Sequence, residues 1–180
     1  SQVTSTCCMF RGPRSFTPPV PFTTPLGSST ANMFESAWVF NQPIEWHTPL
    51  VTSTAYMFRS ARAFDSELHM DTWRVTDMQN MFAWASAFDN GGQPLTLDTS
   101  QVTSMSGMFR GASSFNQSVP FNTSLVTSMA YMFESASVFN QPIEWHTPLV
   151  TSTAYMFYGA RSFDQRLQVD TGRVTDMGYM

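Results

Sequence analysis

The sequence contains no lysine, and all nine of its basic residues are arginine. Together with thirteen acidic residues they give a net charge of −4. The arginines are scattered along the chain and form no basic run, whereas binding to nucleic acid requires a concentrated positive surface. We therefore expect no nucleic-acid partner.

Long apolar stretches are also missing, although 42% of the residues are hydrophobic. A membrane-spanning helix needs about 20 consecutive apolar residues, and the apolar runs of this chain are only a few residues long. We expect no direct membrane insertion by this segment. The chain starts at Ser1 within a repeat, shows no signal peptide and stops within a repeat, so we expect it to be a piece of a longer protein.

Cysteine is limited to the adjacent residues Cys7 and Cys8. Adjacent cysteines rarely bond to each other, because the geometry of the bridge would distort the peptide between them. The equivalent residues one long repeat later are Ser106 and Gly107, which favours two thiols at a variable position. A disulfide to sequence upstream is the alternative.

What the chain has instead is a repeat, marked by a Met-Phe pair. The Phe of the pair stands at positions 10, 34, 58, 82, 109, 133 and 157, and Met180 begins an eighth pair. The steps are 24 residues except for one of 27, whose three extra residues we place in a loop near Asn90, Gly91 and Gly92. A fixed period in this range predicts a solenoid, in which no coil can bury its apolar face alone. Residues 1–180 are therefore assigned to a single solenoid fragment of about seven and a half coils.

The two halves of each coil have different periodicities. Counted from a Val such as Val126, apolar residues follow at 3, 6, 7 and 10. This pattern predicts a short α-helical or 3-10 segment, with the Thr after the Val, such as Thr52 or Thr127, as its N-cap. Apolar residues then alternate, as at Ile44 and Trp46, which predicts a short strand with one face inward. The predicted fold is an α/β repeat solenoid, leucine-rich-repeat-like, with one short parallel strand and one short helical segment per 24-residue coil. Strands stacked at about 4.8 Å would give a block roughly 35 Å long.

Two sets of residues recur at fixed positions in the coils. The Met and Phe residues are predicted to fill the interior as stacked columns, since both side chains pack well there. The Asn or Asp after the second Phe of a coil is predicted to bond the backbone of the neighbouring coil. The predicted core columns are Met33, Phe34, Phe40, Met57, Phe58, Phe64, Met81, Phe82, Phe88, Met108, Phe109, Phe115, Met132, Phe133, Phe139, Met156, Phe157 and Phe163, and the predicted turn column is Asn41, Asp65, Asp89, Asn116, Asn140 and Asp164.

A second, longer period is present. Residues 36–58 and 135–157 differ at one position, Trp38 against Ser137, so four coils form a 99-residue super-repeat that was either duplicated recently or kept uniform. Core packing constrains only inward residues, whereas here the exposed positions are uniform as well. The super-repeat therefore indicates a long array built from one unit.

The run VTSMAYMFESASVFNQPIEW at 126–145, and VTSMSGMFRGASSFNQ at 102–117, carry a recognisable motif. The chain resembles the BspA-type leucine-rich-repeat-like surface proteins, with 24- to 26-residue repeats as in mycoplasma-type surface lipoproteins and some protist and algal proteins. The resemblance implies a protein exposed at a cell surface or secreted, used for adhesion or assembly, with no catalytic motif. The first coil departs from the pattern, because it lacks the Asn-Gln pair.

Candidates for a chemical site are few. His47, His69 and Asp71 fall on the predicted exposed strand face and could contribute to a metal site, but no HxxxH or HExxH spacing supports one, and we assign no metal and no cofactor. Two sequons allow N-glycosylation, at Asn122 and at Asn116. Asn122 is the better candidate because Asn116 belongs to the turn column.

Two functions therefore stand, and an enzyme is not expected. The first is an extracellular or cell-surface structural or adhesive protein, whose partners are itself or other surface proteins and whose array forms a rod, coat or fibre. The second is a discrete module that binds a protein or a glycan through the exposed strand face. A structural array should show the same exposed residues unit after unit, and Glu45 does return as Glu144.

Overall fold

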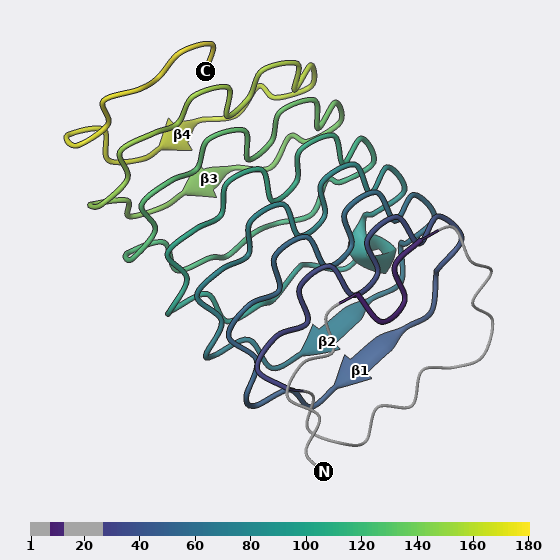
Figure 1. Ribbon diagram of the computed structural model, residues 1–180. Helices are drawn as coiled ribbons and strands as arrows, with labels where there is room; N and C mark the ends of the chain where they lie inside the picture. The colour runs from purple at the N-terminus through teal and green to yellow at the C-terminus, as the bar shows by residue number, and fades with distance from the viewer. Residues whose placement is uncertain (1–7, 13–26) are drawn as a thin grey trace.

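In a computed structural model of the protein, residues 8–12 and 27–180 are described. Successive windings of the chain lie one on another from one end of the molecule to the other (Figure 1). We call each winding a coil, and the residues at one position of successive coils a column. One such column joins all the coils through parallel bridges between neighbours, namely Ser29–Ser53, Ser53–Asp77, Asp77–Ser104, Ser104–Ser128, Ser128–Ser152 and Ser152–Asp176.

Two short parallel pairs of strands lie on one side of the stack. β1 (Ile44–Trp46) pairs with β2 (Leu68–Met70), with Ile44 opposite Leu68. β3 (Ile143–Glu144) pairs with β4 (Leu167–Gln168). In β1 the outer two side chains are buried and the middle one, Glu45, is exposed, as the alternation of a strand requires.

The prediction of a strand in every coil is wrong for the coils that contain Leu95–Leu97 and Val119–Phe121. In the second of these segments proline explains the loss, because its nitrogen carries no hydrogen to donate to a neighbouring strand. Pro120 occupies the middle of the second segment, and the next N–H, of Phe121, donates to Val119 of its own coil (2.7 Å). Val20 and Phe22, the predicted strand of the first coil, lie outside the described residues.

The predicted helical segment is also wrong, because the first half of the coil is a run of turns. An α-helix would use its N–H groups on carbonyls four residues back. Here the N–H groups alternate between a carbonyl three residues back and a carbonyl of the next coil, so half of them hold the stack together. In one coil the bonds within it are Met57→Thr54, Arg59→Tyr56 and Ala61→Phe58, and those to the next coil are Tyr56→Gln79, Phe58→Met81 and Ser60→Ala83.

This alternation needs left-handed backbone at two residues of the coil. Tyr56 has φ 60° and Ser60 has φ 58°, each at the third position of a turn, where a type II turn requires φ > 0. The threonine expected as an N-cap instead joins two neighbouring coils. The N–H and the hydroxyl of Thr52 both donate to the carbonyl of Ser28 in the preceding coil, at 2.8 and 3.1 Å.

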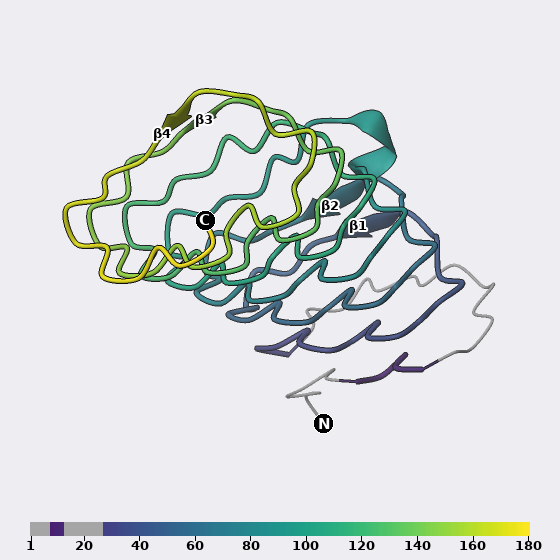
Figure 2. The same cartoon turned by 90° about the horizontal axis from the view of Figure 1, so that it is seen from above.

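The interior contains two adjacent columns of stacked phenylalanine rings. Within one coil Phe58 and Phe64 stack with ring centroids 4.1 Å apart, and between coils Phe58 and Phe82 stack at 5.6 Å with an interplanar angle of 2°. A Met column lies beside them, and all members of the predicted core columns are buried except Phe157 and Phe163, which are half-buried. Seen from above, the coils follow one another along one axis (Figure 2).

The Asn and Asp column lies along the turn that precedes the strands. Each of its first five side chains accepts a hydrogen bond from the backbone N–H of the next residue in the column. These bonds, given as acceptor and donor, are Asn41–Asp65 (2.8 Å), Asp65–Asp89 (2.6 Å), Asp89–Asn116 (2.8 Å), Asn116–Asn140 (2.8 Å) and Asn140–Asp164 (2.8 Å). The column thus supplies acceptors for backbone N–H groups that have no hydrogen bond from strand pairing.

The three extra residues of the 27-residue coil form a single 3-10 turn, η1 (Asn90–Gly92), which projects from the stack (Figures 1 and 2). Asn90 is buried, and its side chain accepts a hydrogen bond from the Leu68 N–H (3.0 Å) and donates to the carbonyls of Gln93 and Pro94. The side chain of Asn90 therefore binds the N–H of the first residue of β2. Among the described residues no helix is both long and apolar enough to span a membrane.

Candidate functional site

The strand face is the first of two exposed surfaces that carry functional groups. We define it by the outward residues of the strands and of the turns that flank them. Two shallow hollows lie on it, of about 530 Å³ and about 510 Å³. The first is lined by Glu45, His47, His69, Asp71 and Thr96 among others, and the second by Ser118, Pro120, Pro142, Glu144 and Trp145 among others.

Imidazole–carboxylate pairs are the main polar contacts of this face. His47 Nδ1 lies 2.5 Å from Asp71 Oδ2, and the same pair recurs one super-repeat later, where His146 Nδ1 lies 2.8 Å from Asp170 Oδ2. His69 pairs separately, with its Nε2 3.1 Å from Glu67 Oε1. The structure therefore places the predicted residues His47, His69 and Asp71 around one hollow.

Asp71 also anchors its turn. Its Oδ2 accepts a hydrogen bond from the Thr48 N–H (3.1 Å), and the Thr48 hydroxyl donates to the Asp71 carbonyl (2.9 Å). The Thr48 N–H and the His47 imidazole thus already occupy the oxygen that a cation would need. No group of three His, Cys, Asp or Glu side chains in residues 8–12 and 27–180 could hold a metal ion.

One carboxylate of the strand face has a shifted pKa. The backbone N–H of Ser100 donates to Asp98 (2.9 Å), and the Ser100 hydroxyl adds a second hydrogen bond. Both bonds favour the charged form, so the pKa of Asp98 lies below its ordinary value. The group therefore stays ionised and fixes the local turn.

The two sequons differ in accessibility. Asn122 is exposed, and its Oδ1 accepts hydrogen bonds from the N–H (3.1 Å) and the hydroxyl of Ser124. Asn116 is half-buried and its Oδ1 accepts the bond from Asn140 described above. A sugar would be attached to the amide nitrogen, which is less accessible at the half-buried Asn116 than at the exposed Asn122.

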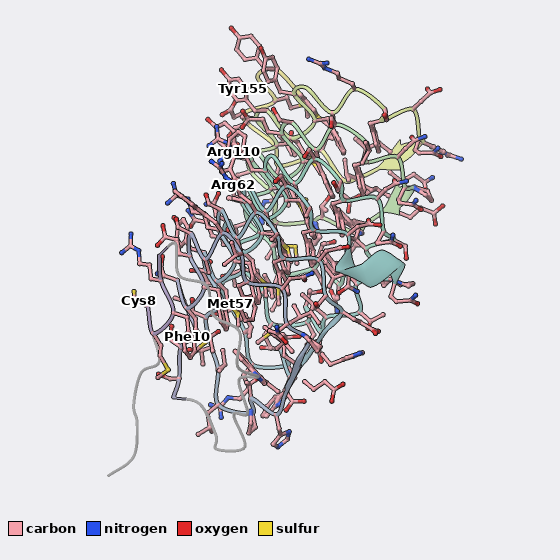
Figure 3. The ribbon with its side chains drawn as sticks, turned by 90° about the vertical axis from the view of Figure 1, so that its right-hand side faces the viewer. Cys8, Phe10, Met57, Arg62, Arg110 and Tyr155 are labelled. Carbon is pink, nitrogen blue, oxygen red and sulfur yellow. The ribbon has the colours of Figure 1, made fainter. Side chains whose placement is uncertain are left out.

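The second surface lies on the opposite side of the stack, and sequence reasoning missed it. We define this turn face by the columns at 5, 8, 9 and 11 residues after the Val of each coil. Arg62, Arg110 and Tyr155 point outward there, away from the strands (Figure 3). A comparison of the exposed positions between coils could have found it, since these columns contain all five tyrosines and six of the nine arginines of the sequence.

Arg110 is the centre of the best-formed cluster on the turn face. Its guanidinium lies 5.7 Å from the ring of Trp84 and 5.0 Å from the ring of Tyr131. Its Nε lies 2.7 Å from Glu134 Oε2, and its Nη2 donates to Oε1 at 3.2 Å. Cation–π contacts, an ion pair and a charge-assisted hydrogen bond of this kind hold the guanidinium of an arginine in one orientation.

Other arginines on this face contact aromatic rings in the same way. Arg62 lies over Trp38 at 5.5 Å and Arg59 over Tyr56 at 5.6 Å. Glu35 pairs with Arg59 (3.3 Å) and with Arg11 (2.9 Å) in the coils on either side. The charged groups therefore link neighbouring coils across the face.

A tyrosine column extends the turn face toward the last coils. Tyr155 stacks on Tyr131 at 5.1 Å and on Tyr179 at 4.8 Å, and Tyr158 contacts it edge-on at 5.7 Å. Desolvation raises the pKa of Tyr155 above its ordinary value, and the neighbouring phenols and Asp176 add to this effect. The column thus favours neutral phenols in contact.

Comparison with known proteins identifies the repeat. A family model described as "Mycoplasma protein of unknown function, DUF285" matches residues 1–94 and again residues 90–180. Neither a curated protein nor a solved structure matches the chain. Because the two matches together cover the whole sequence, the protein belongs to the DUF285 family of repeat proteins.

Proposed function

We propose that this protein is a non-enzymatic structural or adhesive component of a cell surface or extracellular layer. In this proposal the stack of coils is a segment of a leucine-rich-repeat-like solenoid of the BspA type. Its binding or assembly depends on a surface that is repeated along the stack, and not on a single pocket. The membership of a repeat family supports the proposal at its coarse level.

The main support for the proposal is that contacts between exposed side chains recur one super-repeat later, together with the residues that make them. The pair His47–Asp71 and the pair His146–Asp170 have the same atoms in contact, and both aspartates also accept a hydrogen bond from the N–H of the threonine after the histidine. In a protein under selection only for its core, the inward columns would be kept, and the residues of such outward pairs would change from one super-repeat to the next. A repetitive layer requires each unit to present the same surface.

The decisive experiment is immunogold electron microscopy of intact cells of the native source, with an antibody raised against this segment. The expected result is label on the outer surface, in filaments or a regular coat, and loss of the label after brief protease treatment of intact cells. An antibody to a cytoplasmic protein is the matched control. Label that appears only after the cells are permeabilised would refute the surface location.

A discrete binding module is the second candidate, and the hollow of about 530 Å³ on the strand face favours it. Its polar lining of Glu45, His69 and Thr96 would suit a protein side chain or a sugar. Glycan-array binding by the wild-type protein and by Glu45→Gln/Glu144→Gln separates the two proposals. Selective binding that the substitutions abolish would favour the module, and indifference to every glycan would favour the structural role.

A further inference from the structure

In the described residues, the ionised groups of the turn face and those of the strand face are mostly of opposite sign. On the turn face the described residues include five arginines and two glutamates, which are Arg11, Arg59, Arg62, Arg110, Arg161, Glu35 and Glu134. On the strand face they include six carboxylates and one arginine, which are Glu45, Glu67, Asp71, Asp98, Glu144, Asp170 and Arg166. One side is therefore positive and rich in aromatic rings, and the other is negative, although the chain as a whole carries −4.

Both faces also hold charges that no internal partner neutralises. Arg62 and Arg161 are exposed and form no ion pair with a carboxylate among residues 8–12 and 27–180. The same holds, within that part of the chain, for the exposed carboxylates of Glu45 and Glu144. These four groups are free to meet groups of opposite sign outside the molecule.

The spacing of these charges matches between the faces. Arg62 and Arg161 are 99 residues apart, and so are Glu45 and Glu144. Each pair is therefore separated by the same four coils, because every coil adds one step of the stack. A second copy lying alongside can bring both arginines onto both glutamates at once, which multiplies the effect of contacts that are individually modest.

From this we propose that the turn face of one molecule binds the strand face of a second copy, so that the stacks associate side by side. The contact is heterologous, because the two surfaces involved are different, and such a contact stays open when it adds each copy without a closing rotation. The two faces lie on opposite sides of the stack, so copies added through them continue in one direction. Its product is an open sheet of parallel stacks. This inference rests on the proposed structural function and names the partner that builds the layer.

The test uses sedimentation velocity of the 180-residue chain over a range of protein and salt concentrations. We expect reversible association that strengthens as salt is lowered, because the charges at the contact are exposed to screening. The substitutions Arg62→Gln/Arg161→Gln should raise the dissociation constant about tenfold or more, since they remove both matched charges of one face. A melting curve of each variant shows whether it is folded.

Arg74→Gln/Arg173→Gln is the matched control. These arginines are also exposed and 99 residues apart, but they lie outside the turn face, at the edge of the strand face, where Arg74 covers Trp73 and lines a hollow with Asp98. The control removes the same charge from the negative side, so it should not weaken the association. Equal loss in both variants would overturn the proposal, because it would reduce the effect to net charge.

A charge swap gives a second and independent readout. Arg62→Glu/Arg161→Glu and Glu45→Arg/Glu144→Arg should each fail to self-associate, and a mixture of the two should form the contact again. A chain that stays monomeric at every salt concentration would overturn the inference and leave the adhesive function standing. So would binding of an acidic polysaccharide such as polygalacturonate through Arg62 and Arg161 by a monomer, which would assign the turn face to glycans.

Discussion

Gly111 lies directly against the indole ring of Trp84 from the preceding coil. A Cβ placed on Gly111 would overlap the Cε3 and Cζ3 atoms of that ring, and the backbone of Gly111 has φ +66°. Two separate demands thus exclude a side chain at this position. The left-handed backbone disfavours any L residue, and the tryptophan leaves no space for one.

Gly111→Ala should lower the free energy of unfolding by about 2 kcal/mol or more, because the cost of a left-handed alanine and the cost of the clash add. Urea denaturation measures the change. Gly92→Ala is the matched control, since Gly92 has φ +75° and a Cβ added there would meet nothing within 4 Å. It should cost about 1 kcal/mol from the backbone alone.

The clash can also be removed from the other side. Serine occupies the column of Trp84 in other coils, as at Ser36, Ser60 and Ser135. Trp84→Ser should therefore recover most of the stability that Gly111→Ala loses beyond the Gly92→Ala control. An additive double substitution would contradict the assignment of the clash to this ring.

Position along the stack should decide the cost of losing a core ring. Phe109 is fully buried and has stacked neighbours in its own coil and in both adjacent coils. Phe157, in the same column, is half-buried. Phe109→Ala should cost about 3–5 kcal/mol, the range for a buried ring that leaves a cavity, and Phe157→Ala should cost clearly less. Equal costs in urea denaturation would show that the rings do not stack as a continuous column.

The columns of the stack could be predicted from the period alone. Residues 24 apart must lie at one position of neighbouring coils, so the Met-Phe spacing is enough to group Met57, Phe58, Met81 and Phe82. The local conformation could not be predicted in the same way. Apolar residues at 3, 6, 7 and 10 fit a helix, but they fit equally a chain of turns whose N–H groups alternate between two coils. The choice between these depends on bonds to the neighbouring coil, which the sequence of one coil does not contain.

The turn face could not be predicted from sequence motifs, for a related reason. Trp84, Arg110 and Tyr131 lie in three successive coils and at three different positions of the repeat, so no short sequence window contains their cluster. Only the stacking places them together. The strand-face pair His47 and Asp71, by contrast, share one column and could be paired from the period.

The turn column offers a test with a natural control. Asn116→Ala removes the acceptor for the N–H of Asn140, which is half-buried, and should cost about 1 kcal/mol in the free energy of unfolding. Asn116→Asp keeps an acceptor at the same place, and Asp65 and Asp89 already occupy this column. The aspartate variant should therefore be close to wild type in urea denaturation. A loss of the same size in both variants would show that the amide NH₂ of Asn116, and not its oxygen, stabilises the turn.

Tyr155 should ionise above the ordinary pKa of tyrosine. Its pKa is raised first by desolvation and then by the neighbouring phenols and Asp176, which all disfavour a phenolate. Because the folded protein holds the proton more tightly than the unfolded chain, the contribution of Tyr155 to stability is complete below the unfolded pKa. It is lost as the pH rises through the folded pKa.

Ultraviolet difference titration of the wild type and of Tyr155→Phe isolates the signal of this phenol. We expect the missing component to titrate on the alkaline side of the free amino acid. Tyr179→Phe keeps the stacked ring, removes one ionisable neighbour and should move the titration of Tyr155 back toward its ordinary value. If Tyr155 titrated at its ordinary pKa in all proteins that retain it, its ring would be solvated as a separate group, and the tyrosine column would not exist in solution.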